Sequence, residues 1–377
     1  MNYNEESIKL HEKNRGKWES GSLVAIENKD DLSLAYTPGV AAVCKEIQAN
    51  PERAYQLTMK ARTVAVVTDG TAILGLGDIG SLAGLPVMEG KCVLYKKFAN
   101  VDAIPLCLEK GSVDEIVETI VRVAPTFGAI QLEDFAAPHC FEVTEKLEQR
   151  LSIPVMQDDQ YGTATVALAG LLNALKLVGK NITDISVVIS GAGAAGLSIA
   201  NVLREAGVTK LQVLDSKGTL TAQSNNAYKV ALAAQINPNN LAQNLREALV
   251  GADVFIGVSQ GGIMTREDVA VMNEKAIVFA LANPTPEIMP DEARAGGAYI
   301  IATGRSDFPN QINNVLAYPG LFRGILDARL QKFTRDMYIR AAHALADLVA
   351  EPTLDRILPS VFDEGVSDAV AQAVKQK

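Results

Sequence analysis

Histidine is scarce in this chain of 377 residues, which contains His11, His139 and His343 and no others. So few imidazoles make a histidine–metal site or a Ser-His-Asp triad hard to build, and proton transfer is expected to fall to lysine or tyrosine. Cysteine is also sparse. Cys44, Cys92, Cys107 and Cys140 match no zinc-binding spacing, so we expect reduced thiols with structural roles.

The chain has no excess of positive charge and no long apolar run. Its net charge of −9, with scattered lysines and arginines, argues against a nucleic-acid partner. The most apolar stretch, Val166–Val178, is too short to span a bilayer and contains Asn173 and Lys176. The first residues lack the apolar core of a signal peptide. We therefore expect a soluble cytoplasmic protein without a membrane partner.

The composition, 48% hydrophobic and 21% charged, is that of a globular protein. A single core rarely grows beyond about 250–300 residues, so the length predicts two domains. Strands and helices alternate along the chain, which predicts an α/β fold. We place an N-terminal α/β domain for substrate and metal at residues 1–160. A Rossmann-type, doubly wound parallel sheet then occupies residues 161–377, with a helical tail over Gly320–Gln376 that packs back on the first domain.

The N-terminal half is expected to contain several buried strands. They are predicted at Thr63–Thr68, Cys92–Tyr95, Ala129–Leu132 and Ile153–Met156, with an amphipathic helix at Val113–Val123. Two acidic couplets, Glu133–Asp134 and Asp158–Asp159, follow the last two of these strands. The carboxyl ends of parallel strands are where open α/β sheets bind ligands. Carboxylates without histidine or cysteine suit Mg²⁺ or Mn²⁺, so the couplets predict a hard-metal site.

The second half opens with a long helix, Thr163–Val178, and then shows a dinucleotide-binding pattern. The strand Ile185–Ile189 leads into Gly191-Ala192-Gly193-Ala194-Ala195-Gly196, and the helix Ala194–Ala206 follows. The glycines permit a tight turn and close approach of a pyrophosphate. Asp215 ends the next strand, Leu211–Leu214, where a ribose-binding acid is required. Asp215 favours NAD, and nearby Lys217 leaves NADP open. Later strands are expected at Val254–Val258, Ile277–Ala282 and Tyr299–Ala302.

The local sequence does not decide the roles of several other residues with reactive or polar side chains. Lys91 lies at the mouth of a predicted strand and would be a general base if buried beside carboxylates. Tyr36 precedes a Pro-Gly turn, Asn283 follows a strand, and Asn314 starts a helix. Each of these is equally compatible with ordinary packing or capping.

A collinear set of motifs resembles the malic enzymes. The set comprises YTPGV from Tyr36, VTDGTAILGLGDIG from Val67, MEGKCVLYK from Met88, QLEDF from Gln131, DDQYGTA from Asp158, GAGAAG from Gly191, FALANPTPE from Phe279 and TGRSDFPNQINN from Thr303. The strings run in the family's order from about Gly21 to Asp327, and the length resembles the short bacterial form.

The resemblance implies a role for each matching residue. Glu133, Asp134 and Asp159 would bind the metal, Lys91 would be the base, Asp158 would assist it, and Tyr36 would protonate the enol. Asn283 and Asn314 would contact the substrate. The implied reaction is metal-dependent oxidative decarboxylation of L-malate to pyruvate with NAD or NADP, in a homodimer.

Two departures from the bacterial pattern leave an alternative open. Gln157 and Tyr161 stand where bacterial relatives usually carry histidine, beside Asp159. The alternative is an oxaloacetate decarboxylase with weak or no hydride transfer, which the intact glycine loop and Asp215 disfavour. A non-catalytic dinucleotide sensor is a third class, and the retention of Tyr36 and Lys91 argues against it.

Overall fold

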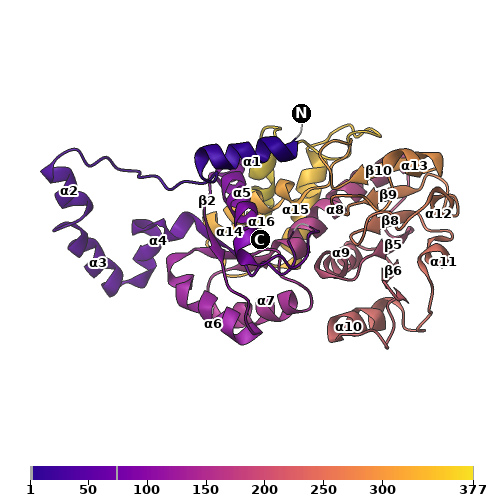
Figure 1. The fold of residues 1–377 in the computed structure, drawn as a ribbon, viewed down its shortest axis with the longest axis horizontal. Helices are drawn as coiled ribbons and strands as arrows, with labels where there is room; N and C mark the ends of the chain where they lie inside the picture. Colours follow the sequence, from indigo (N-terminus) through magenta and orange to yellow (C-terminus); the bar gives the residue numbers. More distant parts are fainter. Residues whose placement is uncertain (1–2, 74, 377) are drawn as a thin grey trace.

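The computed structural model describes residues 3–73 and 75–376, and each half of the chain is built on one β-sheet (Figure 1). The first sheet is parallel throughout, with the order β2 (Asp102–Cys107), β1 (Thr63–Thr68), β3 (Ala129–Leu132) and β4 (Val155–Gln157). The second has the order β10 (Ile300–Thr303), β9 (Ile277–Ala280), β8 (Val254–Gly257), β5 (Ser186–Ser190), β6 (Lys210–Asp215) and β7 (Gly218–Thr219). In the second sheet β7 runs antiparallel to β6 and the other pairs are parallel. The predicted α/β class is confirmed.

Helices precede β1, lie in the connections between successive strands other than β6 and β7, and follow β10. In chain order they are α1 (Tyr3–Asn14), α2 (Lys29–Ala35), α3 (Val40–Ala49), α4 (Ala54–Leu57), α5 (Ser81–Ala99), α6 (Val113–Val123), α7 (His139–Arg150), α8 (Asp158–Val178), α9 (Ala194–Glu205), α10 (Ala227–Ile236), α11 (Leu245–Leu249), α12 (Arg266–Val269), α13 (Pro290–Ala295), α14 (Tyr318–Asp327), α15 (Arg335–Asp347) and α16 (Val366–Lys375). A 3₁₀ turn, η4 (Asn314–Leu316), precedes α14.

The predicted strand at Cys92–Tyr95 is wrong, because these residues lie inside helix α5. The buried residues of α5 include Met88, Cys92, Tyr95 and Ala99, a spacing of three to four that belongs to a helix. The apolar run from Cys92 to Tyr95 resembles a short buried strand when that wider spacing is overlooked. Lys91 therefore lies in the middle of a helix and not at a strand mouth.

β1 pairs with β3 on one side and with β2 on the other, and β2 was not predicted. Pro105 interrupts its apolar run, and proline is tolerated there because β2 is the edge strand of the sheet. β1 and β3 have the predicted bounds, and all their residues are buried.

Helix α8 begins earlier than the predicted Thr163, at Asp158 directly after β4. Gln157 caps it by accepting a hydrogen bond from the Gln160 backbone N–H. The helix is long and apolar enough to cross a membrane by composition, but most of it is buried in the protein, where it packs against α9 and α15. It is a core helix, and it crosses the predicted domain boundary near residue 160.

The C-terminal tail is helical and packs back on the first half, as predicted. Helix α14 contacts both α5 and α16, and α15 contacts α8 (Figure 1). Tyr318 and Phe322 of α14 lie edge-on to Tyr95 of α5, with ring centroids 4.9 and 5.6 Å away. This aromatic contact fixes α14 against the helix that carries Lys91.

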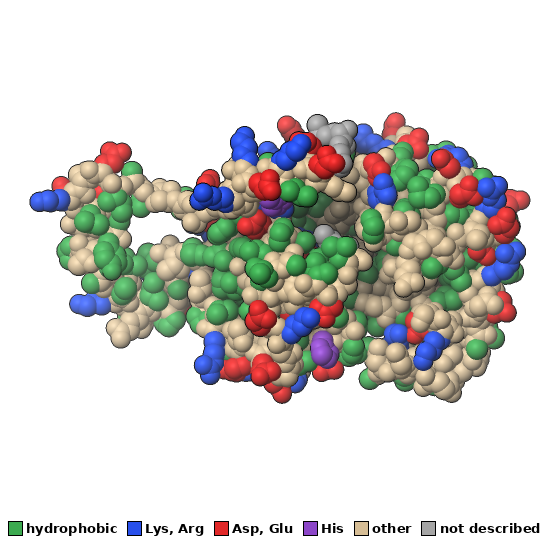
Figure 2. Space-filling model, viewed as in Figure 1, with side chains coloured by type: hydrophobic (Ala, Val, Ile, Leu, Met, Phe, Trp, Pro, Cys, Tyr) green, Lys and Arg blue, Asp and Glu red, His purple; other side chains and the backbone are tan. Residues whose placement is uncertain are grey.

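One segment stands clear of the rest of the molecule. We call residues 21–49, which include α2 and α3, the arm (Figure 1). Hydrophobic side chains are exposed along it (Figure 2), and they belong to Leu23, Val24, Ile26, Leu32, Leu34 and Tyr36. Leu23 and Leu34 are 81% and 78% exposed, so the arm keeps apolar surface in water that another surface would be expected to cover.

Candidate active site

Three carboxylates meet where β3 and β4 end. Glu133, Asp134 and Asp159 each offer an oxygen, and these oxygens lie within 4.8 Å of one another. Leu132 of β3 is paired in register with Gln157 of β4, so the two acidic couplets leave the sheet side by side. The cluster lies at the carboxyl edge of a parallel sheet, as predicted.

The backbone at Asp134 explains how adjacent acids face one cleft. In an extended strand Glu133 and Asp134 would point to opposite sides. Asp134 instead has a φ of 57°, the left-handed region, so the chain turns sharply just after β3. The Asp134 backbone N–H then donates to Asp159 Oδ2 at 2.9 Å, which joins the two couplets.

The ligand set fits a small, hard divalent cation. It consists of carboxylates without histidine or thiolate, which favours Mg²⁺ or Mn²⁺ over zinc. Glu133 and Asp134 are only 2% and 3% exposed, and Asp158 is fully buried nearby. Buried carboxylates at this density require compensating positive charge, of which Lys91 supplies one unit.

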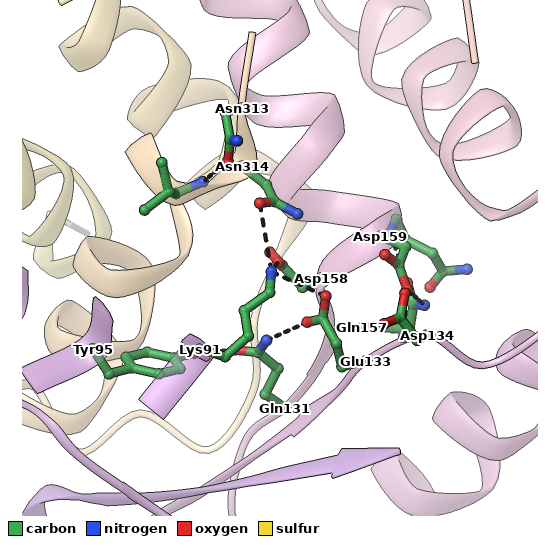
Figure 3. Close-up of polar contacts among 12 residues, drawn as sticks. Lys91, Tyr95, Gln131, Glu133, Asp134, Gln157, Asp158, Asp159, Asn313 and Asn314 are labelled. Atoms are coloured by element: carbon green, nitrogen blue, oxygen red, sulfur yellow. Dashed lines mark hydrogen bonds and ion pairs between the residues drawn. The ribbon is translucent and has the colours of Figure 1, made fainter. Parts of the chain in front are cut away.

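Lys91 reaches the cluster from α5 and is held by several groups (Figure 3). Its Nζ lies 2.6 Å from Asp158 Oδ2 and 2.9 Å from Glu133 Oε1. Asn314, at the start of η4, presents Oδ1 at 3.5 Å. The Tyr318 ring lies under the ammonium, 4.4 Å from Nζ to its centroid. The structure thus brings Lys91, Asp158 and Asn314 together beside the three metal-type carboxylates.

The pKa values of this cluster are displaced by burial and mutual charge. Burial raises the pKa of Glu133 well above its usual range and that of Asp158 to about 6, with Lys91 opposing both shifts. Burial alone would lower the pKa of Lys91, but Asp158 and Glu133 together hold it well above the ordinary lysine value. Lys91 is therefore protonated at neutral pH.

Glycine at position 162 makes room for Asp158. A Cβ there would lie 1.9 Å from Asp158 Oδ1 and 3.2 Å from the Asn314 Cβ. Gly162 is part of α8, one turn after Asp158, so any side chain would displace the carboxylate that holds Lys91.

Two predicted site residues lie apart from this cluster. Tyr36 caps the end of α2 on the arm and is 66% exposed. Asn283 is exposed beyond the end of β9, and its amide faces the Leu281 carbonyl oxygen at 3.5 Å.

The predicted dinucleotide loop lines a large cleft. Gly191 has a φ of 115° and Gly193 precedes α9, whose first residues are Ala194 and Ala195. A Cβ on Gly196 would lie 1.7 Å from the Gly191 carbonyl oxygen, so helix and loop approach closely only because position 196 is glycine. The cleft has a volume of about 880 Å³ and is also lined by Ala137 and Pro138, which follow the Glu133–Asp134 couplet. The dinucleotide cleft therefore reaches the chain segment that directly follows the first acidic couplet.

Asp215 stands at the far side of the same cleft, as predicted, but it is already paired. Lys229 of α10 donates to its Oδ2 at 2.7 Å, and the Lys217 backbone N–H donates to Oδ1 at 2.9 Å. Partial burial would raise the pKa of Asp215, and these bonds outweigh burial and lower it. No local pattern marked Lys229 in advance, because it follows Asp215 in no recognised motif.

Three further residues near the acids were not among the predicted site residues. Gln131 and Gln157 donate to Glu133 and Asp159, and Tyr95 contacts Gln131 (Figure 3). A usable signal was present for Gln131, since it precedes Glu133 by two residues and side chains so spaced on a strand share a face.

Comparison with known proteins gives consistent matches along the chain. Residues 15–148 match a family model described as malic enzyme, N-terminal domain, and residues 160–377 match malic enzyme, NAD binding domain. A bifunctional malic/malolactic enzyme of Bacillus subtilis is 52% identical, covering 99% of this chain and 92% of the relative. An NAD-dependent malic enzyme of Geobacillus stearothermophilus is 51% identical, covering 95% and 76%. The crystal structure of an NAD-dependent malic enzyme from Thermotoga maritima, 45% identical, superimposes with a TM-score of 0.94 over 98% of both chains.

Proposed function

The chain belongs to the malic enzyme family, and from this premise we propose how its residues divide the work of NAD(P)-dependent oxidative decarboxylation of L-malate to pyruvate and CO₂. The observation that carries the proposal is the position of Lys91. Its Nζ contacts Asp158 and Glu133 beside the three-carboxylate cluster, and Ala137 and Pro138, which follow that cluster in the chain, line the dinucleotide cleft.

Glu133, Asp134 and Asp159 would hold the divalent cation, Mg²⁺ or Mn²⁺. When bound, such a cation supplies electrophilic chemistry by polarising the C2–O bond of malate. Glu133 and Asp134 follow β3, Asp159 lies in the first turn of α8 after β4, and the Asp134–Asp159 hydrogen bond joins the two segments. The ligands are thus held by the sheet and by α8.

Lys91 is the proposed general base for the C2 hydroxyl. It accepts the hydroxyl proton while the C2 hydride passes to the nicotinamide, which leaves oxaloacetate. An amine accepts a proton only when neutral, and Glu133 and Asp158 favour its charged form. A cation bound to the Glu133 carboxylate would offset its attraction for the Lys91 ammonium. The pKa of Lys91 would then fall, which favours the neutral amine that accepts the proton. Asp158 orients the amine through its 2.6 Å hydrogen bond.

The second half of the reaction needs an acid. Oxaloacetate loses its C4 carboxylate as CO₂, and the electron pair of the broken C3–C4 bond gives the enolate of pyruvate. Tyr36 is proposed to donate a proton to C3, which completes pyruvate. Asn314, 3.5 Å from Lys91, and Asn283, beyond β9, are proposed to bind the substrate from the second half of the chain.

Tyr36 can take this role in a homodimer. On its own chain it is exposed at the end of α2, on the arm that projects away from α5, the helix that carries Lys91 (Figure 1). The apolar side chains of the arm are also exposed, and burying them at about 25 cal/mol per Å² favours association with a second copy. We propose a soluble cytoplasmic homodimer in which the arm of each chain carries Tyr36 into the active site of its partner.

NAD is the proposed preferred coenzyme. The Gly191–Gly196 loop, with the N–H groups of Ala194 and Ala195 at the start of α9, would receive the pyrophosphate. Asp215 would accept hydrogen bonds from a ribose 2′-hydroxyl and repel a 2′-phosphate. Lys229 and Lys217 weaken that repulsion, so we expect the enzyme to use NADP as well, with a lower efficiency than NAD.

The test is to incubate the protein with Mn²⁺ and L-malate, follow NADH and NADPH absorbance, and measure oxaloacetate decarboxylation in parallel. We expect malate-dependent reduction of NAD that Lys91→Ala abolishes. Lys97→Ala, which removes an exposed lysine from the same helix, is the matched control and should not change the rate. Oxaloacetate turnover without reduction of either coenzyme would replace the proposal with the decarboxylase alternative.

A further inference from the structure

Two glutamines contact the acidic cluster, Gln131 beside Glu133 and Gln157 beside Asp159 (Figure 3). Gln131 Nε2 donates to Glu133 Oε2 at 2.5 Å, and Gln157 Nε2 donates to Asp159 Oδ2 at 2.6 Å. Both glutamine side chains are fully buried. Buried amides are costly unless all their groups are bonded, so their presence beside two of the three metal-type carboxylates calls for a reason.

The backbone places each amide against its acid. Gln131 of β3 stands two residues before Glu133, and side chains so spaced on an extended chain point to the same side. Gln157 ends β4, which pairs with β3 in register, and Asp159 lies in the first turn of α8. The contact between Gln157 and Asp159 is therefore made across the junction between strand and helix.

The far end of each amide is also occupied, which fixes its orientation. The Gln157 Oε1 accepts from the Gln160 backbone N–H at 2.6 Å, and a backbone N–H can only donate. The Gln131 Oε1 accepts from the Tyr95 hydroxyl, buried in α5. With both oxygens engaged, the NH₂ groups must face the carboxylates.

The consequence for the carboxylates is that one oxygen of each is already taken. Glu133 Oε2 is bonded to Gln131, which leaves Oε1, the oxygen next to Lys91. Asp159 Oδ2 accepts from both Gln157 and the Asp134 backbone N–H, which leaves Oδ1. A carboxylate restrained in this way offers a cation one oxygen and not two.

We propose that Gln131, supported by Tyr95, and Gln157 are positioning residues that make Glu133 and Asp159 single-oxygen ligands. This inference rests on the proposed metal site. Mg²⁺ and Mn²⁺ accept octahedral sets of single oxygens, whereas Ca²⁺ takes more oxygens and commonly binds carboxylates through both. The glutamines thereby favour the smaller cation over Ca²⁺.

The experiment measures Mn²⁺ binding to the full chain by electron paramagnetic resonance, without malate or coenzyme, and Ca²⁺ binding by competition. Gln131→Leu and Gln157→Leu should each raise the Mn²⁺ dissociation constant about 10–100-fold, the usual effect of losing a group that orients a metal ligand. The Ca²⁺ constant should rise less, so the preference for Mn²⁺ narrows. Gln212→Leu makes the same change on β6 of the other sheet and should leave Mn²⁺ binding unchanged.

Two milder variants keep the test decisive if a leucine variant does not fold. Tyr95→Phe removes the hydroxyl while keeping the ring against Tyr318, and should weaken Mn²⁺ binding less than Gln131→Leu. Gln157→His restores a donor toward Asp159 and should bind Mn²⁺ more tightly than Gln157→Leu. NADH binding, measured by fluorescence, should be the same in all folded variants.

The outcomes separate this inference from the metal site itself. Absence of Mn²⁺ binding to the unaltered chain, or no effect of Glu133→Gln on it, would refute the metal site. Normal Mn²⁺ binding that is unchanged by Gln131→Leu and Gln157→Leu would overturn the positioning role alone. If the leucine variants do not fold, unchanged Mn²⁺ binding in Tyr95→Phe would overturn the positioning role.

Discussion

Mixing two inactive variants tests whether Tyr36 acts across a dimer. Tyr36→Phe removes the proposed acid from the arm, and Lys91→Ala removes the proposed base from the body of the chain. Each homodimer should lose activity by about 10²–10⁴-fold, the usual contribution of a positioned acid or base. In a mixed dimer, the Tyr36→Phe chain keeps its own Lys91 and receives an intact Tyr36 from its partner. One complete active site is thus restored.

The magnitude follows from counting sites. Random pairing of equal amounts makes half of the dimers mixed, and half of the sites in each mixed dimer are complete. About one quarter of all sites should therefore regain full activity in a twofold dimer. If Tyr36 served its own chain, every site in the mixture would lack one group, and activity would stay near background.

The assay is malate-dependent NADH production after co-expression of the two chains with different affinity tags. A reciprocal mixture provides the control, in which the chain carrying both substitutions is paired with the unaltered chain. Acting across the dimer predicts about one quarter of full activity there, and acting within a chain predicts about one half. Background activity in the first mixture, with mixed dimers recovered on both tags, would refute the exchange of arms.

Three further predictions concern the described contacts. Lys91→Met should lower the free energy of unfolding of the metal-free protein by about 3–5 kcal/mol at pH 7, because it leaves buried carboxylates uncompensated. These acids have raised pKa values, so they protonate as the pH falls and the loss of unfolding free energy should become smaller. Urea titrations at pH 7 and pH 5 measure this loss, and an equal loss at the two pH values would contradict the argument. Gly196→Ala forces a Cβ against the Gly191 carbonyl oxygen and should lower the free energy of unfolding by about 1–3 kcal/mol. Fluorescence titration should show that NADH binds about 10-fold more weakly, while Mn²⁺ binding is unchanged. Burial raises the pKa of Cys140 to about 12, so at pH 8 its thiol stays neutral and Ellman's reagent should label exposed Cys44 far faster; equal rates would show that α7 opens readily.

Elements with a self-contained pattern were predictable from the sequence. β1 and β3 are continuous buried runs, and their predicted bounds are those observed. Helix α6 has an amphipathic pattern and a capping box at Ser112, and it also has the predicted bounds. The failures occurred where local and tertiary signals conflict. Cys92–Tyr95 resembles a strand locally, and its helical state depends on packing against α14.

The composition of the site was more predictable than its connections. Carboxylates at two strand ends were sufficient to predict a hard-metal site, because parallel strands end at one edge. The pairing of Asp215 with Lys229 depends on where α10 packs, and no local pattern specifies that. The location of Tyr36 on a projecting arm was equally inaccessible, because what covers an exposed arm is a property of the assembly and not of the local sequence.

Helix α8 limits how chains of this kind can exchange parts. Its first turn carries Asp158 and Asp159, while the rest of its length is buried against α9 and α15. Adding or deleting one residue along it would rotate the two acids by about 100° relative to the surface they leave. A crossover between related genes at residue 160 would have to keep the number of helical residues between the two acids and the buried part of α8 unchanged. Viable hybrids are therefore expected to join before β4 or after Val178, so that the two acids and their helix are inherited as one block.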